Sequence, residues 1–179
     1  MTAGGRSGDA RIMQNIQDTT HRPETDPVDG TALRSPFHDH LGFQLLEWRE
    51  NFARMAVDLQ PHHLNRHGIP HGGVILAMLD ETGAAAGNWS NTSGQVRRSV
   101  TVDLNAHFTG RAHGGRVIAT ARIASQGRSI FFASTEIHDA HGTLIAFGSS
   151  THRRSRESHG HGHDAQGPGA GAEESQPGE

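Results

Sequence analysis

Large apolar side chains are concentrated in the middle of the 179-residue chain, and their spacing changes along it. Within Phe52–Leu59, apolar residues alternate with polar or small ones, which is the period of a half-buried strand. The apolar run Leu41–Trp48 predicts another strand, and a short helix is expected ahead of it around Thr31–His40. The first half of the apolar region therefore predicts a helix followed by two adjacent strands.

The alternation is lost at Val74–Ala86, where almost every side chain is apolar. This segment is too long for a typical strand, and glycines bound it at Gly72–Gly73 and Gly87, so it predicts a buried helix. Four more strands are predicted after it, at Ser99–Phe108, Arg116–Ala124, Arg128–His138 and Thr143–His152. A helix that is apolar all round must be covered, and a curved antiparallel sheet of five to six strands provides that cover. The order of elements predicts an α+β hotdog fold, in which a sheet wraps a long central helix.

Both ends of the chain are rich in Gly, Ser, His, Glu and Pro and lack hydrophobic periodicity. They predict a flexible leader at 1–32, a single hotdog domain at 33–153 and a disordered tail at 154–179. The tail contains His159, His161 and His163. We expect these histidines to be solvated rather than to bind a metal, because nothing in the tail fixes a coordination geometry.

The composition excludes several classes of function. The chain has no cysteine, which excludes disulfides, thiolate metal sites and cysteine nucleophiles. Its formal charge of -3 does not favour nucleic acid as a partner. No run approaches the ~20 apolar residues of a membrane span, and the N-terminus has no secretory apolar segment. A cytoplasmic protein with no membrane association is expected.

Two features of the predicted helix suggest chemistry. Gly72 lies where the helix begins, and free N–H groups at a helix start polarise a carbonyl and stabilise an oxyanion. Asp80 lies in the middle of the apolar helix, where a carboxylate costs desolvation unless it has a partner or a function. The adjacent Glu81 points about 100° away and is assigned no role.

The spacing of these two residues constrains how they act together. Eight residues of helix separate Gly72 from Asp80, which corresponds to roughly 12 Å along the axis. A base or nucleophile must lie within about 3 Å of its target atom, or one water further. One protomer therefore cannot use both groups on one carbonyl, whereas two antiparallel helices in a twofold dimer can. If both groups are catalytic, the enzyme is at least a homodimer.

Two longer stretches of sequence carry a family resemblance. The first is HLNRHGIPHGGVILAMLDETGAAAG, in which an Asn-x-x-Gly-x-x-His-Gly-Gly motif is followed by an acid seven residues after the second glycine. The second is VTVDLNAHFTGRAHGGRVIATARIASQGRSIFFASTEIHDAHGTLIAFGSSTHRR. Together they resemble hotdog thioesterases of the phenylacetic-acid-degradation type, a group that includes 4-hydroxybenzoyl-CoA thioesterases. The resemblance covers about residues 41 to 153 and implies hydrolysis of an acyl-CoA thioester to a carboxylic acid and CoA.

The resemblance also implies roles for single residues. It implies that the Gly72 N–H polarises the thioester carbonyl, and that Asp80 of the partner subunit is the general base or the nucleophile. Asn65 matches a position that orients the water or nucleophile, His71 one that shapes the oxyanion end, and Thr101 one where related enzymes have a serine that assists water. The residues implied in binding substrate and CoA are Gly73, Gly127, Arg128, Ser129 and Arg111. No metal or cofactor is expected, because thioesters are activated acyl donors.

Thr101 has only weak support from the pattern of its own strand. Strict alternation places Val100, Val102, Leu104, Ala106 and Phe108 on one face, and Thr101, Asp103, Asn105 and His107 on the other. Thr101 is thus expected on the polar face, at an unknown distance from Asp80.

Two other functions remain open at this point. A hotdog hydratase or dehydratase would pair His67 or His71 with a helix carboxylate, but the position of that acid is occupied by Met78. A non-catalytic acyl-CoA-binding module would gain nothing from Asp80 in an apolar helix. The sequence leaves open the acyl group, the choice between general base and nucleophile, and the choice between dimer and tetramer.

Overall fold

The computed structural model describes residues 33–90 and 97–155. The predicted leader and nearly all of the predicted tail, including its histidines, lie outside the described residues. The first helix, α2 (Pro36–Leu41), begins after Ser35, whose hydroxyl accepts a hydrogen bond from the His38 N–H. It ends at Gly42, which has a φ of 64° and closes the last turn in the left-handed conformation. The predicted helix is therefore present, with its described part starting later than expected.

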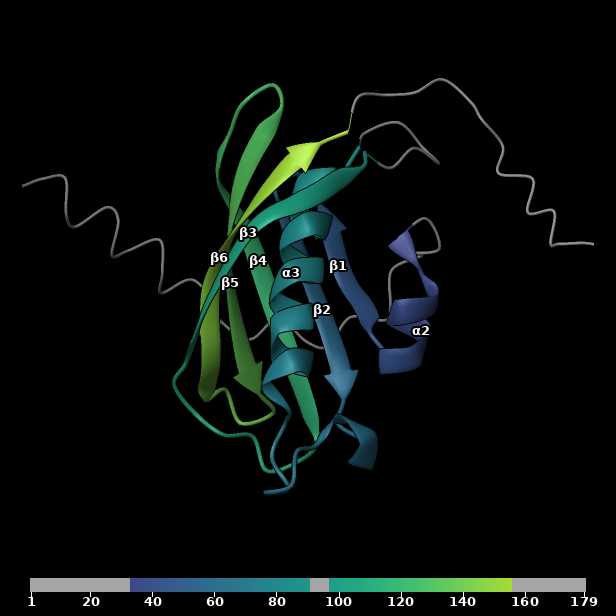
Figure 1. Cartoon of the computed structure of the whole chain (residues 1–179), viewed down its shortest axis with the longest axis vertical. Coiled ribbons are helices and arrows are strands. Elements are labelled where there is room, and N and C mark those ends of the chain that lie inside the picture. The colour runs from purple at the N-terminus through teal and green to yellow at the C-terminus, as the bar shows by residue number, and fades with distance from the viewer. Residues whose placement is uncertain (1–32, 91–96, 156–179) are drawn as a thin grey trace, which may run out of the picture.

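A single long helix lies against a six-stranded antiparallel sheet (Figure 1). The helix is α3 (Gly72–Asn88), and a short 3-10 turn, η2 (Pro61–His63), precedes it. The strands are β1 (Gln44–Arg49), β2 (Phe52–Asp58), β3 (Ser99–Phe108), β4 (Arg116–Gln126), β5 (Ile130–Asp139) and β6 (Leu144–Arg154). Their order across the sheet is β1-β2-β4-β5-β6-β3. The predicted hotdog fold is confirmed, and β6 reaches Arg154, the first residue of the predicted tail.

Close packing holds α3 on the concave side of the sheet. Its buried residues Ile75, Met78 and Leu79 share one cluster with side chains of β2, β4, β5 and β6. Near the end of the helix, Gly87 lies directly against the ring of Phe131, and a methyl group at this position would overlap the ring. On the opposite flank, the Trp48 indole N–H donates to the Ala85 carbonyl at 2.8 Å and ties β1 to the helix. Among the described residues, no helix is long and apolar enough to cross a membrane.

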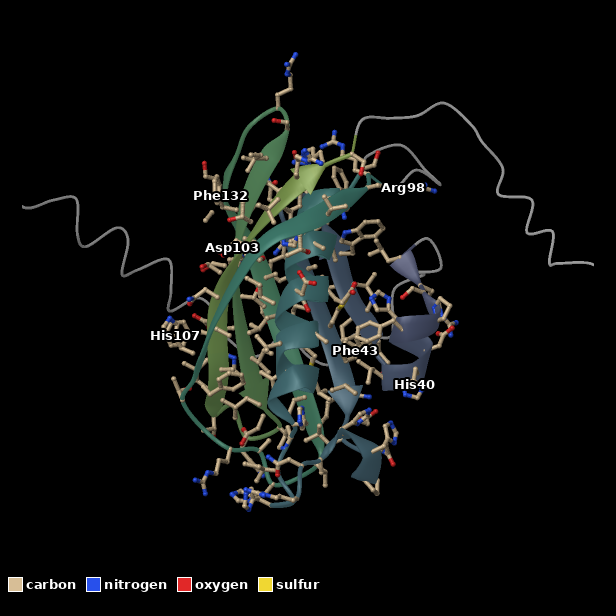
Figure 2. All side chains as sticks on the ribbon, viewed as in Figure 1. His40, Phe43, Arg98, Asp103, His107 and Phe132 are labelled. Carbon is tan, nitrogen blue, oxygen red and sulfur yellow. The ribbon has the colours of Figure 1, made fainter. Side chains whose placement is uncertain are left out.

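The face assignment predicted for β3 is wrong at its start, because the strand contains a bulge. Thr101 pairs with the buried His152, whereas Asp103 pairs with Thr151, so Val102 is an extra residue between the two pairs. Partners across an antiparallel pair share a face, so Thr101 faces α3 together with Leu104 and Ala106. Beyond the bulge the predicted alternation holds, and Asp103 and His107 lie on the outer face of the sheet (Figure 2).

Candidate active site

The loop before α3 is ordered by its own hydrogen bonds. Asn65 accepts at its Oδ1 from the His67 N–H at 2.8 Å, and its backbone N–H donates to the Ile69 carbonyl. Gly68 has a φ of 71°, a conformation that costs glycine little and other residues more. His71 then caps the helix, because its Nδ1 accepts from the Gly73 N–H at 2.9 Å. The loop thus fixes where the helix begins, and no described residue accepts a hydrogen bond from the Asn65 side-chain NH₂ group.

The Gly72 N–H is the free donor at this helix start. Within the described part of the chain, no acceptor is bonded to it, whereas the neighbouring Gly73 N–H is taken by His71. Gly72 opens on a pocket of about 420 Å³. Ile69, Ile75, Phe108 and Ile145 form much of the apolar wall of this pocket, and Asn65 and Arg111 are its main polar lining. The pocket combines an apolar wall with a backbone donor, a composition that suits a ligand with an apolar part and a hydrogen-bond acceptor.

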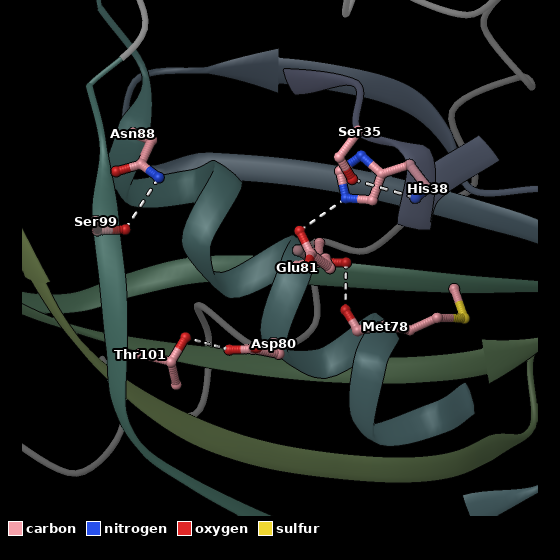
Figure 3. Close-up of polar contacts among 9 residues, drawn as sticks. Ser35, His38, Met78, Asp80, Glu81, Asn88, Ser99 and Thr101 are labelled. Carbon is pink, nitrogen blue, oxygen red and sulfur yellow. Dashed lines mark hydrogen bonds and ion pairs between the residues drawn. The ribbon is translucent and has the colours of Figure 1, made fainter. Parts of the chain in front are cut away.

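Asp80 lies two turns further along α3, on its half-buried side. The Thr101 hydroxyl donates to Asp80 Oδ1 at 2.7 Å, and Figure 3 shows the two side chains pointing toward each other. This contact depends on the β3 bulge, because Thr101 would otherwise point to the outer face. Ala77 and Ala84, one turn before and after Asp80, are also half-buried, so two small side chains flank the carboxylate along this stripe, and Leu76 is the larger half-buried neighbour.

A buried histidine lies behind Thr101. His152 is fully buried and its ring stacks on Phe131, with centroids 4.8 Å apart. Its Nδ1 lies 3.3 Å from Thr101 Oγ1, and its Nε2 lies 2.8 Å from the buried Ser150 Oγ. Burial lowers the pKa of His152, and the nearby charges of Asp80 and Glu81 oppose that shift.

Glu81, beside Asp80, has a separate partner. Its Oε2 lies 2.7 Å from His38 Nε2, so it binds α2 to α3 on the side of the helix away from Thr101 (Figure 3). The hydrogen bond that His38 donates to Glu81 raises the pKa of His38, outweighing the opposing effect of burial. Two adjacent carboxylates therefore have different environments, and only Asp80 faces β3.

The remaining predicted residues lie in two places. Arg111 lines the pocket at Gly72. The turn between β4 and β5, which contains Gly127, Arg128 and Ser129, lies at the other end of the sheet, where α3 ends (Figure 1). Two backbone hydrogen bonds hold this turn: the Gly127 N–H donates to the Ile130 carbonyl, and the Arg154 N–H donates to the Ser129 carbonyl. The Arg128 side chain is exposed.

One protomer thus carries two separate groups of polar residues. The pocket group comprises Asn65, Gly72 and Arg111, and the carboxylate group comprises Asp80 and Thr101. Eight residues of continuous α-helix separate Gly72 from Asp80, or roughly 12 Å along the axis. Gly72 and Asp80 of one chain are therefore too far apart to contact the same reacting atom.

Comparison with known proteins decides the family. A model described as "Thioesterase superfamily" matches residues 67–146, which includes Gly72, Asp80 and Thr101. Rv1847 of Mycobacterium tuberculosis, a protein provisionally named an esterase, is 32% identical over 128 residues, covering 71% of this chain and 91% of its own length. The chain belongs to the thioesterase superfamily.

Other members of the superfamily agree in sequence and in fold. The medium/long-chain acyl-CoA thioesterase YigI of Escherichia coli is 27% identical over 133 residues, covering 65% of this chain and 84% of YigI. The structure of a mutant of the phenylacetic acid degradation protein PaaI from Thermus thermophilus is 29% identical, with a TM-score of 0.59, and covers 68% of this chain and all of PaaI. The predicted family and the predicted enzyme class, a thioester hydrolase, are confirmed.

Two residues beside α3, Ser150 and His152, were not among the site residues predicted from the sequence. Both lie on the inward face of β6, where every other residue contacts the core. The sequence contains one sign of them: two polar residues occupy alternate positions on a strand face that is otherwise apolar. Buried polar groups need partners, so this pattern indicates a polar contact in the core. Gly83 was a second signal: a methyl group there would lie 2.6 Å from Ser150 Oγ and 3.3 Å from His152 Nε2.

Proposed function

We propose that this protein hydrolyses acyl-CoA thioesters at a site shared between two protomers. The Gly72 N–H of one protomer binds the thioester carbonyl, and Asp80 of the partner subunit activates the water or attacks the carbonyl itself. The observation that carries the proposal is the free Gly72 N–H at the start of α3, opening on an apolar pocket two turns from a half-exposed carboxylate.

The pocket supports an acyl donor as the ligand. Its apolar walls suit an acyl chain, and the Gly72 N–H has the helix dipole behind it, which favours negative charge on the carbonyl oxygen. The Asn65 side-chain NH₂ group is a second donor at the same pocket, because its Oδ1 is already occupied by His67. His71 acts indirectly, since its Nδ1 takes the Gly73 N–H and leaves that of Gly72 as the donor available to substrate.

The exposed surfaces of α3 and β3 support a twofold dimer. β3 is the last strand of the sheet, and its outer edge has no partner among the described residues. Val100 and Val102 on this strand are 49% and 61% exposed. If β3 and α3 meet their copies antiparallel about a twofold axis near Leu76 and Ala77, Gly72 of each protomer faces Asp80 of the partner subunit. The small Ala77 permits a close approach of the two helices.

The reaction needs no metal. As a general base, Asp80 takes a proton from water while the hydroxide adds to the thioester carbon, and the oxyanion is stabilised by Gly72 N–H. The C–S bond then breaks, CoA leaves as the thiolate, and the proton held by Asp80 passes to it. As a nucleophile, Asp80 instead attacks the thioester carbon, the C–S bond breaks and CoA leaves as the thiolate. Water then hydrolyses the resulting acyl anhydride to the carboxylic acid and regenerates Asp80. Arg128 with Gly127 and Ser129, and Arg111 beside the pocket, are the proposed contacts for the CoA phosphates.

A panel of acyl-CoAs with aromatic, medium and long acyl groups, assayed by thiol release, tests the activity. We expect turnover of at least one of them, and a loss of about 10²–10⁴-fold in kcat for Asp80→Asn with retained binding. The matched control is Glu81→Gln, which removes the adjacent carboxylate and should keep kcat within a few fold. Hydration of crotonyl-CoA without thiol release would favour a hydratase, and binding without turnover would favour a binding module.

The shared site is tested by complementation between two inactive variants. Gly72→Pro removes the N–H, and Asp80→Asn removes the carboxylate. Co-expressed with different tags, they form mixed dimers in which one of the two sites has both groups intact. Statistical mixing should restore about a quarter of wild-type activity. No recovery in isolated mixed dimers, or full activity of a monomer, would contradict a site shared between subunits.

A further inference from the structure

The side chains behind Asp80 form a continuous hydrogen-bonded series that starts in the core. Ser150 Oγ lies 2.8 Å from His152 Nε2, His152 Nδ1 lies 3.3 Å from Thr101 Oγ1, and Thr101 Oγ1 lies 2.7 Å from Asp80 Oδ1. Ser150 and His152 come from β6, Thr101 from β3 and Asp80 from α3. The series therefore connects three elements of the fold to one oxygen of the carboxylate.

Two local features of the fold make room for this series of side chains. Gly83 has no side chain to displace Ser150 and His152, and the β3 bulge turns Thr101 inward to meet His152. The ring of His152 is fully buried and is stacked on Phe131, so it has little freedom to rotate. A buried imidazole with both nitrogens within hydrogen-bonding distance of hydroxyl groups is a satisfied polar group with a fixed orientation.

The number of available protons determines which atom donates in each hydrogen bond of the series. The Thr101 hydroxyl has one proton, and an ionised carboxylate only accepts, so this proton goes to Asp80. Thr101 Oγ1 must then accept from His152 Nδ1, which requires the proton of a neutral imidazole to be on Nδ1. With Nε2 unprotonated, the Ser150 hydroxyl donates to it. Burial, which lowers the pKa of His152, favours this neutral form.

We infer that His152 is a positioning residue, which acts through Thr101 to hold one oxygen of Asp80 and leave the other free for the reaction. In the opposite tautomer, Nδ1 would compete with Asp80 for the single Thr101 proton, and the carboxylate would lose its anchor. The inference rests on the proposed function for its kinetic consequence, but the tautomer is a property of the folded protein alone.

The tautomer is measured directly. Long-range ¹H–¹⁵N spectra of ¹⁵N-histidine-labelled protein at neutral pH should show His152 neutral, with the proton on Nδ1, and the assignment follows from loss of the signal in His152→Asn. Ser150→Ala removes the donor to Nε2 and should shift the signal toward the other tautomer. A wild-type ring protonated on Nε2, or on both nitrogens, would overturn the inference whether or not the enzyme is active.

Kinetics of two matched variants test the positioning role. His152→Asn places an amide N–H near the position of Nδ1, whereas His152→Gln places it near Nε2. Asparagine is one methylene shorter than glutamine, so it leaves the larger gap beside Phe131. We expect His152→Gln to lower kcat about three- to tenfold with KM within twofold, and His152→Asn to retain most of kcat. The melting temperature should fall at least as far in His152→Asn as in His152→Gln, so a larger kcat loss in the Gln variant does not come from lost stability.

A double-mutant cycle separates this role from a merely structural one. If His152 acts through Thr101, the kcat loss of His152→Gln should disappear in a Thr101→Val background. Equal kcat losses in the Asn and Gln variants, or a loss that persists without the Thr101 hydroxyl, would overturn the inference. If the His152 variants do not fold, Ser150→Ala replaces them in the cycle. Ser150→Ala should lower kcat about twofold, and this loss should also disappear in the Thr101→Val background. Failure of the proposed function would differ, because wild-type protein would then release no thiol from any acyl-CoA.

Discussion

The beginning and the middle of α3 place a polar group in an apolar helix in two different ways. At the beginning, the donor belongs to the backbone: the Gly72 N–H is free because of helix geometry, and no side chain of the described residues binds it. In the middle, the polar group is a side chain, and Asp80 needs Thr101 on β3, with His152 and Ser150 behind it. The first site is therefore fixed by local sequence, whereas the second depends on contacts between three elements.

This difference predicts that substitutions at the two sites lower the activity for different reasons. At Gly72, only the loss of the N–H should matter, and the surroundings should tolerate small changes of shape. At Asp80, partners distant in sequence should each contribute a part of the activity.

At the beginning of α3, a large effect is expected from removing the N–H of Gly72 without disturbing the helix. Proline is well tolerated at the first position of a helix, and the extended backbone of His71, with a ψ of 135°, is compatible with a following proline. Gly72→Pro should lower kcat by about 10²–10³-fold. Gly72→Ala keeps the N–H and puts a methyl 3.6 Å from Phe108, an ordinary contact, so it should lose much less activity. Equal losses in both, measured by thiol release, would mean that shape rather than the N–H is essential.

A stability effect is expected at Gly87, one of two closely packed glycines of α3. A methyl group there overlaps the Phe131 ring, which is fully buried and stacked on His152. Gly87→Ala should lower the free energy of unfolding by about 1–3 kcal/mol, even though alanine favours helix. The same substitution at Gly72 should change the free energy of unfolding by less than about 1 kcal/mol. Urea denaturation of both variants would test this, and equal stabilities would contradict the packing argument.

A smaller effect is expected from Thr101. Thr101→Val removes the hydroxyl but keeps the branched shape, so it should lower kcat about fivefold to tenfold through loss of one hydrogen bond to a charged group. Thr101→Ser keeps the hydroxyl and should retain most of the activity. If valine and serine behave alike in thiol-release assays, the contact with Asp80 has no part in the reaction.

The two sites also differ in how far the sequence predicts them. The order of elements, the buried helix and the spacing of Gly72 and Asp80 follow from hydrophobic periodicity and glycine positions, which are local. The inward orientation of Thr101 does not, because period-2 alternation gives no sign of the extra residue at Val102. The contact between Glu81 and His38 was also missed, since it joins elements whose packing only the folded chain defines.

The smallest effect is expected at Glu81, the carboxylate beside Asp80 that has a structural rather than a catalytic partner. Glu81 raises the pKa of His38 above its ordinary value of 6.5, so their pairing stabilises the fold most when His38 is protonated. That contribution is fully present below about pH 6.5 and is lost as pH rises through the higher pKa of the folded state. Glu81→Gln should therefore lower the free energy of unfolding by less than about 1 kcal/mol near pH 6, and the difference from wild type should vanish in alkaline solution.

The matched control for Glu81 is Glu47, which pairs with Arg49 at 3.0 Å. Arginine keeps its charge across this range, so any effect of Glu47→Gln on unfolding should not change with pH. Urea denaturation of wild type and both variants at several pH values measures the two differences. A Glu81→Gln difference that grows with rising pH would reverse the sign of the linkage and exclude protonated His38 as the partner. A difference that falls with rising pH would assign Glu81 to the attachment of α2, leaving Asp80 as the one acid of this helix that is free to act on substrate.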